Sequence, residues 1–296
     1  MSTTDATFAA LEPLKRLTKD LLNASRTLTT HQARFLVDAF YMLQKNRIAA
    51  AHQVRTLTAS EEPHAVIEWL EAQNEMLEGQ IKRALDKWSD GQPVGEWAKS
   101  ICGIGPVIAS GLLAHIDITK APTVGHIWSF AGLNPSKSWN RGEKRPYNAA
   151  LKTLTTFKLG ESFVKVQNND NDIYGRVYAE RKRMEIERND ALVFQGAAAE
   201  RMGKVGKSTE AYKAYKIGKL PPAHIHARAR RYAVKLFLAH YHAVAFYVQY
   251  GLMPAFPYVF QHMEGHVDFI APPHVDLIPG LKAAVKRYEQ KLRERE

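Results

Sequence analysis

The stretch Gly103-Ile104-Gly105-Pro106 joins a short glycine loop to the start of a helical pattern. Glycine tolerates a tight turn, and proline suits the first position of a helix, which needs no N–H. The turn would present consecutive backbone N–H groups, including that of Val107, to a phosphate without any cationic side chain. Ile104 would point back and pin the loop. The pattern predicts a helix-hairpin-helix element that contacts the DNA backbone; a plain turn between packed helices is the alternative.

The positive charge of the chain is concentrated directly after this hairpin. Residues 140–235 contain 21 Lys and Arg residues against 10 Asp and Glu residues, an excess equal to the formal net charge of +11 for all 296 residues. Such a local basic field favours a polyanionic partner, with nucleic acid first and a membrane surface second. A solvated basic surface is the alternative.

Three cations share one face of a strong helical pattern over residues 223–250. Arg228, Arg231 and Lys235 follow one another at i, i+3 and i+7. On a helix this spacing forms a row, which could lie along the phosphates of one strand.

The histidines of the same helix do not form a metal-binding pattern. They come in pairs two residues apart, which point in different directions on a helix: His224 with His226, and His240 with His242. No cysteine partner or acid at ligand spacing accompanies them. We expect no metal site and no cofactor; a divalent metal becomes a candidate only if the chain is catalytic.

The elements that position these residues are predicted to be helices, because apolar residues recur at helical spacing over most of the chain. We expect a mainly α fold: a helical N-terminal arm or bundle (1–92), a helix-hairpin-helix-containing domain (93–251), and an extended, Pro- and aromatic-rich tail with a terminal helix (252–296). The expected helices of the middle part cover 127–135, 148–167 with Phe157 inward, 173–202 as one long helix, and 223–250 with a buried C-terminal half; 203–222 is expected as a surface excursion.

With the hairpin and the segment after it in view, residues 97–165 resemble the C-terminal domain of the IS110/IS116/IS902 transposases. The matching residues are Gly103-Ile-Gly-Pro106, Ala109, Leu112-Leu-Ala114, Ile116, and Phe130-Ala-Gly-Leu-Asn-Pro135. The resemblance implies DNA binding. The family's RuvC-like N-terminal domain, with its four metal-binding acids, is expected to be missing, with the helices of residues 6–90 in its place.

The resemblance also implies a serine nucleophile after the Ala-Gly-Leu-x-Pro segment. By position Ser138 is the better match and Ser136 the second. Such a serine would attack a phosphodiester and hold it covalently during recombination. The cations that follow in the same basic stretch could clamp phosphate: Arg141, Lys144, Arg145 and Lys152.

These patterns leave three functions open. The first is a DNA-binding protein of a mobile element or phage that holds the backbone with low sequence preference. The second is an active serine transposase or recombinase that needs a partner chain or RNA; the third is a non-catalytic helical scaffold. We expect DNA as the partner, with RNA as an alternative, and a homo-oligomer such as a dimer.

The cysteine count and the hydropathy of the chain predict its cellular compartment. The single cysteine, Cys102, excludes an intrachain disulfide, and no signal peptide or apolar run of membrane-spanning length is visible. We expect no membrane association and a cytoplasmic, nucleoid-associated location in a bacterial cell.

Overall fold

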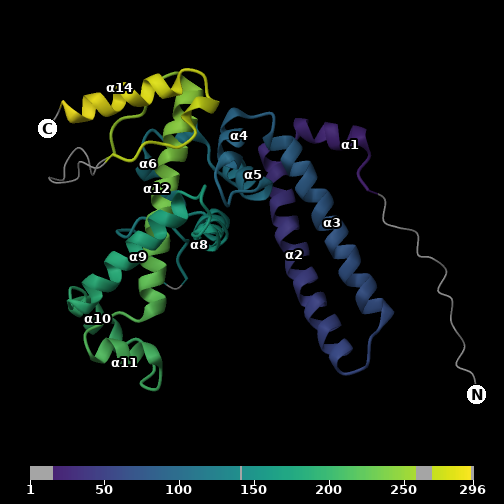
Figure 1. Cartoon of the computed structure of the whole chain (residues 1–296), viewed down its shortest axis with the longest axis horizontal. Helices are drawn as coiled ribbons and strands as arrows, with labels where there is room; N and C mark the ends of the chain where they lie inside the picture. The colour runs from purple at the N-terminus through teal and green to yellow at the C-terminus, as the bar shows by residue number, and fades with distance from the viewer. Residues whose placement is uncertain (1–15, 141, 258–268, 295–296) are drawn as a thin grey trace, which may run out of the picture. The chain divides into compact units, whose positions relative to one another are not determined.

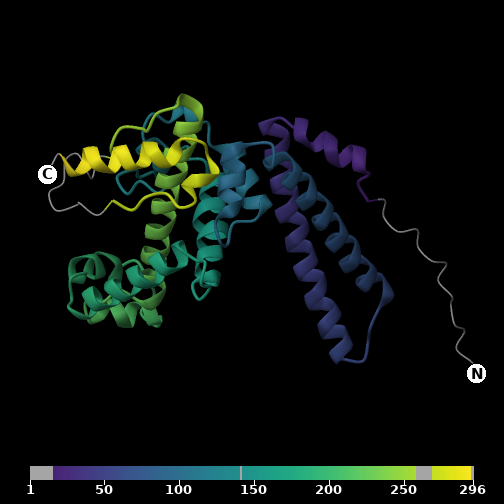
Figure 2. The same cartoon turned by 45° about the horizontal axis from the view of Figure 1, so that its top comes forward.

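The computed structural model describes residues 16–140, 142–257 and 269–294, and its contacts divide the chain into two compact units, Met1–Ser89 and Asp90–Glu296. The regular elements of the described residues are helices, with no β-strand among them (Figures 1 and 2). The prediction of a mainly α fold is therefore confirmed.

Unit 1 is built on an antiparallel pair of long helices. Its elements are α1 (Lys19–Ala24), η1 (Ser25–Thr27), α2 (Thr30–Ala59) and α3 (Ala65–Ser89). Thr29 starts α2 with a capping box, in which its side chain accepts from the N–H of Gln32 and the Gln32 side chain accepts from the N–H of Thr29. The Arg47 Nε lies 2.7 Å from Glu78 and joins the two long helices, as does their apolar packing.

Unit 2 contains the hairpin and the basic segment. Its elements are α4 (Pro93–Ser100), α5 (Pro106–His115), η2 (Ile118–Lys120), α6 (Val124–Phe130), α7 (Ala149–Lys152), η3 (Thr153–Leu159), α8 (Gly160–Val166), α9 (Tyr174–Asp190), α10 (Gln195–Met202), α11 (Glu210–Lys216), α12 (Pro222–Tyr250), η4 (Val275–Leu277) and α14 (Leu281–Arg293). The central element is α12, which packs against α4, α6, α8 and α9. In Figures 1 and 2, α10 and α11 lie near its N-terminal end and α14 near its C-terminal end.

Aromatic rings from four helices form the core around α12. Phe237 of α12 stacks on Trp97 of α4, with ring centroids 5.9 Å apart, and meets Tyr174 of α9 edge-on at 5.3 Å. Tyr174 in turn stacks on Phe163 of α8 at 4.9 Å. All four rings are fully buried, and each contributes about 2 kcal/mol from burial alone. This cluster fixes the hairpin helix α4 and the basic helices α9 and α12 to one another.

The ends of α12 agree with its sequence signals. Pro222 occupies the first turn, and Gly251 caps the last turn in the left-handed region, at φ 71°. The predicted burial of its C-terminal half holds only in part, because Val248 and Tyr250 are exposed. The last turn of the helix therefore meets solvent.

The predicted helix over 127–135 is wrong in its bounds, since α6 begins at Val124 and ends at Phe130. Gly132 adopts φ 65°, a left-handed conformation that terminates the helix, and the N–H of Leu133 closes the turn on the carbonyl of Trp128 at 2.8 Å. The turn reverses the chain into the polar linker.

The segment 148–167 is helical, but its central turn, η3, is a π-helix. Because its hydrogen bonds reach from i to i+5, the turn holds an extra residue and rotates the apolar face. Leu159 and Phe163 are buried, whereas Phe157 is 52% exposed. The prediction that Phe157 points inward is therefore wrong.

The helix expected over 173–202 is broken between α9 and α10. Leu192 adopts φ 58°, and Phe194 turns into a small core with Ala198, Tyr215, Leu220 and Ile225. The stretch 203–222 is thus more than a surface excursion, because it contains α11, which packs against α10. Burial of Phe194 drives the break, since one straight helix would leave it apart from α11 and α12.

His240 is buried in the core with both ring nitrogens bonded. Its Nε2 donates to the carbonyl of Ile270 at 2.8 Å, which leaves Nδ1 to accept from the hydroxyl of Tyr174 at 2.7 Å. Burial lowers the pKa of His240 to about 4, so the ring is neutral near pH 7.

This burial predicts a loss of stability in mild acid. Below pH 6.5 the unfolded chain binds a proton at His240, whereas the folded chain binds that proton only below about pH 4. The free energy of unfolding therefore falls between pH 6.5 and pH 4, by up to about 3 kcal/mol. His240→Gln keeps a donor for Ile270 and removes this titration. Thermal unfolding between pH 7 and pH 4 checks the prediction; an unchanged pH slope in the variant would contradict it.

Candidate nucleic-acid interface

A tight turn at Gly103 and Ile104 joins α4 to α5, and we keep the name hairpin for these two helices and their turn. The N–H of Ile104 bonds to the carbonyl of Ile101 at 2.9 Å and closes the turn, and the Ile104 side chain is 5% exposed. Gly103 lies at φ 91°, and the Ser162 hydroxyl of α8 donates to its carbonyl. A Cβ at Gly103 would stand 2.9 Å from the Ser162 Oγ. The first glycine is therefore required by the backbone and by its neighbour.

Gly105 plays a different part, because it is the N-cap of α5. It is exposed, has φ −95°, and no side chain caps the helix. Pro106 follows at the first helical position, and the side chain of Val107 is buried, so only the backbone N–H of Val107 can reach a ligand. A Cβ at Gly105 would meet no heavy atom within 4 Å, so the space in front of this helix end is open.

The two candidate serines lie on the exposed linker that follows α6. The Ser136 hydroxyl donates to Asn134 Oδ1 at 2.8 Å, whereas the Ser138 hydroxyl has no hydrogen-bond partner among the described residues. No described acid or histidine bonds to Ser138 as a general base. The chemistry expected of a nucleophile would need an activating group from outside this part of the chain.

The cations near the serines divide between exposed and packed positions. Arg141 lies outside the described residues. Lys144 and Arg145 are exposed, and the Arg145 guanidinium lies 5.5 Å above the ring of Trp139. The Lys152 ammonium covers the ring of Tyr147 at 4.2 Å. Lys152 thus packs beside the turn at the end of α6 and is less free than the linker cations.

The row on α12 is present, but its three cations have different surroundings. Arg228 bonds through Nε to Glu185 of α9 at 2.7 Å. The Arg231 side chain reaches solvent but is partly surrounded by neighbouring groups. The Lys235 ammonium lies 4.6 Å from the ring centroid of Trp128. Neither Arg231 nor Lys235 forms an ion pair with a described residue.

Glu185 holds the basic helices together. This carboxylate is 1% exposed and accepts from Arg228 and from Arg181, whose NH2 group lies 2.6 Å away. Burial opposes its ionisation, but the hydrogen bonds and charges of Arg228 and Arg181 outweigh that effect and lower the pKa of Glu185. One buried carboxylate therefore pairs with two arginines at the junction of α9 and α12.

Two further residues, which the sequence patterns did not place here, lie beside this row. Burial lowers the pKa of His224 to about 4, and the charges of Arg201, Arg231 and Arg228 contribute to that shift, so this ring is neutral near pH 7. Burial also lowers the pKa of Arg231, aided by the charges of its arginine neighbours, Arg201 among them. We call the four cations Arg201, Arg228, Arg231 and Lys235 the cation cluster.

Arg201 comes from α10 and was missed because 173–202 was expected as one straight helix. After the break, Ala198 of α10 packs with Leu220 and Ile225 at the start of α12. Asn189 of α9 bonds to both backbone groups of Leu220, at 2.8 and 3.0 Å, and so holds the start of α12 against α9. The available signal was Leu192-Val193-Phe194, an apolar run at polar positions of a charged helix.

The hairpin and the linker lie in a segment that is similar to a known family. Residues 96–145 match the Transposase IS116/IS110/IS902 family. This transposase-like segment contains most of α4, the hairpin, α5, α6 and the linker as far as Arg145. The resemblance seen in the sequence is thereby confirmed for this segment, while all four members of the cation cluster lie beyond it. No curated protein and no solved structure matches the chain.

Two other kinds of feature, a metal-binding group of side chains and a membrane-spanning helix, are absent from the described residues. No group of three His, Cys, Asp or Glu side chains lies close enough to hold a metal ion in the part of the chain that the structure describes. Within that part, no helix combines the length and the apolar character needed to cross a bilayer.

Proposed function

We propose that the chain is a DNA-binding protein of a mobile element or phage that holds the phosphate backbone with low sequence preference. The observation that carries the proposal is the cation cluster, in which Arg201, Arg231 and Lys235 have no acidic partner among the described residues. Phosphate contacts position a protein on DNA without reading its bases. We place this activity in the bacterial cytoplasm, at the nucleoid.

Crowding of like charges is what makes an anion favourable here. The pKa of Arg231 is lowered by burial and then by Arg228, Arg230 and Arg201, so its charged state is less favoured in the free protein. A phosphate placed among these groups would reverse that effect and would add charge-assisted hydrogen bonds. Binding would also release counterions from the DNA.

The hairpin supplies a second, uncharged contact. The N-terminus of α5 is exposed at Gly105, lacks a side-chain cap and carries the partial positive charge of the helix dipole. Its free N–H groups suit one phosphate oxygen. Because the transposase-like segment contains this hairpin, DNA is favoured over RNA and over a membrane surface.

A second copy of the chain is proposed as a further partner, through unit 1. The pair α2–α3 exposes large apolar side chains, among them Phe35 at 68% and Trp69 at 43%. So many exposed apolar side chains on one pair of helices favour burial against another copy of the chain. A dimer would double the phosphate contacts of one assembly.

Removal of one cluster cation should weaken binding and its dependence on salt. Arg231→Gln deletes a charge that has no acidic partner among the described residues, so the slope of log K against log salt should fall in magnitude by about 1. Arg287→Gln on α14 removes the same charge outside the cluster and should leave the slope unchanged. Fluorescence anisotropy with a labelled duplex over a salt series measures both. Wild-type binding that does not respond to salt would instead support the scaffold function.

A side chain at the hairpin should block the helix N-terminus without harming the fold. Gly105→Val places two methyl groups in open space at a permitted φ, so the melting temperature should hold while affinity falls about tenfold, the worth of a charge-assisted hydrogen bond. Gly79→Val, at an open position in α3, is the matched control. Equal affinity of both variants and wild type would refute backbone contact at the hairpin.

A second function, serine-type recombination, is favoured by the exposed, unbonded hydroxyl of Ser138 within the transposase-like segment. If a partner chain, RNA or divalent metal activates it, incubation with supercoiled DNA should yield a covalent adduct on a denaturing gel. Ser138→Ala should abolish the adduct and Ser136→Ala should retain it. An adduct that survives in Ser138→Ala would exclude this serine as the nucleophile.

A further inference from the structure

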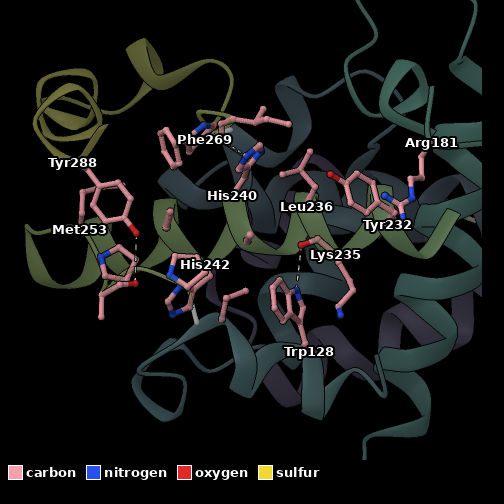
Figure 3. Close-up of a pocket in the computed structure, with 18 residues that line it drawn as sticks. Trp128, Arg181, Tyr232, Lys235, Leu236, His240, His242, Met253, Phe269 and Tyr288 are labelled. Carbon is pink, nitrogen blue, oxygen red and sulfur yellow. Dashed lines mark hydrogen bonds between the residues drawn. The ribbon is translucent and has the colours of Figure 1, made fainter. Parts of the chain in front are cut away.

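A cavity of about 500 Å³ lies beside the cation cluster in unit 2, with α12 as its floor (Figure 3). Its walls come from α6, α9, α14 and the chain segments around Met253 and Ile270. This volume falls in the range of small-molecule sites and is sufficient for a nucleotide. Nothing in the transposase-like match accounts for it, because most of its lining comes from residues after 145.

The cations of the cavity stand over aromatic rings toward one side of it. Lys235 lies over Trp128 at 4.6 Å, and the Arg181 guanidinium lies over Tyr232 at 4.7 Å. Figure 3 shows these four side chains on one side, away from Met253 and Tyr288. The remaining lining is mostly apolar. A ligand that fits has an anionic group at one end and a flat, largely apolar body.

Lys235 links the cavity to the cation cluster. It is one helical turn from Arg231, and burial together with the charge of Arg231 lowers its pKa. A half-buried ammonium without an acidic partner among the described residues gains from a nearby phosphate. A strand held on Arg231 would therefore carry its next phosphate to the entrance of the cavity.

His242 contributes an uncharged ring to the wall of the cavity. Its Nε2 donates to the carbonyl of Ala121 at 2.7 Å, and burial lowers its pKa, so the ring is neutral near pH 7. This side chain is 2% exposed and lines the cavity. The positive charge of the lining therefore stays with Lys235 and Arg181, and the opposite wall suits an uncharged ring.

We propose that the cavity receives one unpaired base of a DNA strand whose phosphates lie on Arg231 and Lys235. The inference rests on the proposed function, because it needs a strand on the cation cluster. Bases stack on aromatic side chains without regard to sequence, and an already unpaired base costs little to move out of a duplex. The site would thus distinguish paired from distorted DNA, which backbone contacts alone do not.

The test compares two duplexes that differ by one unpaired 2-aminopurine, placed as a bulge in the second. The full chain should bind the bulged duplex about tenfold more tightly, the worth of one stacked base, and the 2-aminopurine fluorescence should change on binding. Ala239→Phe fills the cavity floor and should abolish the preference while the perfect duplex binds as before; Ala239→Ser, which leaves the space open, should retain it.

Lys235→Gln provides a second variant in case Ala239→Phe fails to fold, and it should reduce the preference for the bulge more than Arg287→Gln does. Equal affinity for both duplexes would overturn the inference and leave the proposed function intact. A preference for the bulge that survives in both cavity variants would also overturn it, by placing the base elsewhere. No binding of either duplex would overturn both proposals.

Discussion

The buried carboxylate of Glu185 is the interaction on which the basic half of the protein depends. It holds Arg181 of its own helix and Arg228 of α12, so α9 and α12 stay paired although both carry several positive charges. A buried acid without these arginines would be strongly unfavourable, and the arginines without the acid would repel one another. Glu185 thus neutralises part of the charge of Arg181 and Arg228, which allows α9 and α12 to pack together. Arg201, Arg231 and Lys235 remain without acidic partners among the described residues.

The two faces of α12 have different roles. Its inner face carries Phe237 and His240 into the aromatic core, where apolar contact and two hydrogen bonds fix the ring positions. Its outer face carries Arg231 and Lys235. Since a helix is rigid over this length, the core sets the spacing of the cations before any ligand arrives. The backbone positions of the two cations are thus preorganised, while their long side chains would still have to be ordered by a bound strand.

Much of this arrangement could be read from sequence where the local signals agree. Pro106 and Pro222 open helices, Gly251 closes one, and Gly103 and Gly105 mark the turn before α5. The signals failed where tertiary packing overrides them. Phe194 breaks a helix that lacks glycine or proline at the break, and the π turn at η3 exposes Phe157. The place of Arg201 depends on that break, and the cavity depends on the return of the C-terminal segment, neither of which periodicity reports.

The phosphate contacts proposed for the hairpin and for the cation cluster rest on different physics, and this difference constrains how the proposed function would work. The α5 N-terminus would offer fixed, uncharged N–H groups, whose geometry admits one phosphate oxygen and whose partial charge loses less to salt than several full charges do. The cation cluster offers several charges at less exact positions, and its strength falls as salt rises. Raising the salt concentration should therefore remove the cluster's contribution first and leave the hairpin's contact as the residual. A chain with the hairpin alone would hold DNA weakly at any salt; in the proposed complex the basic helices beyond the transposase-like segment would supply the attraction, and the hairpin would supply the register.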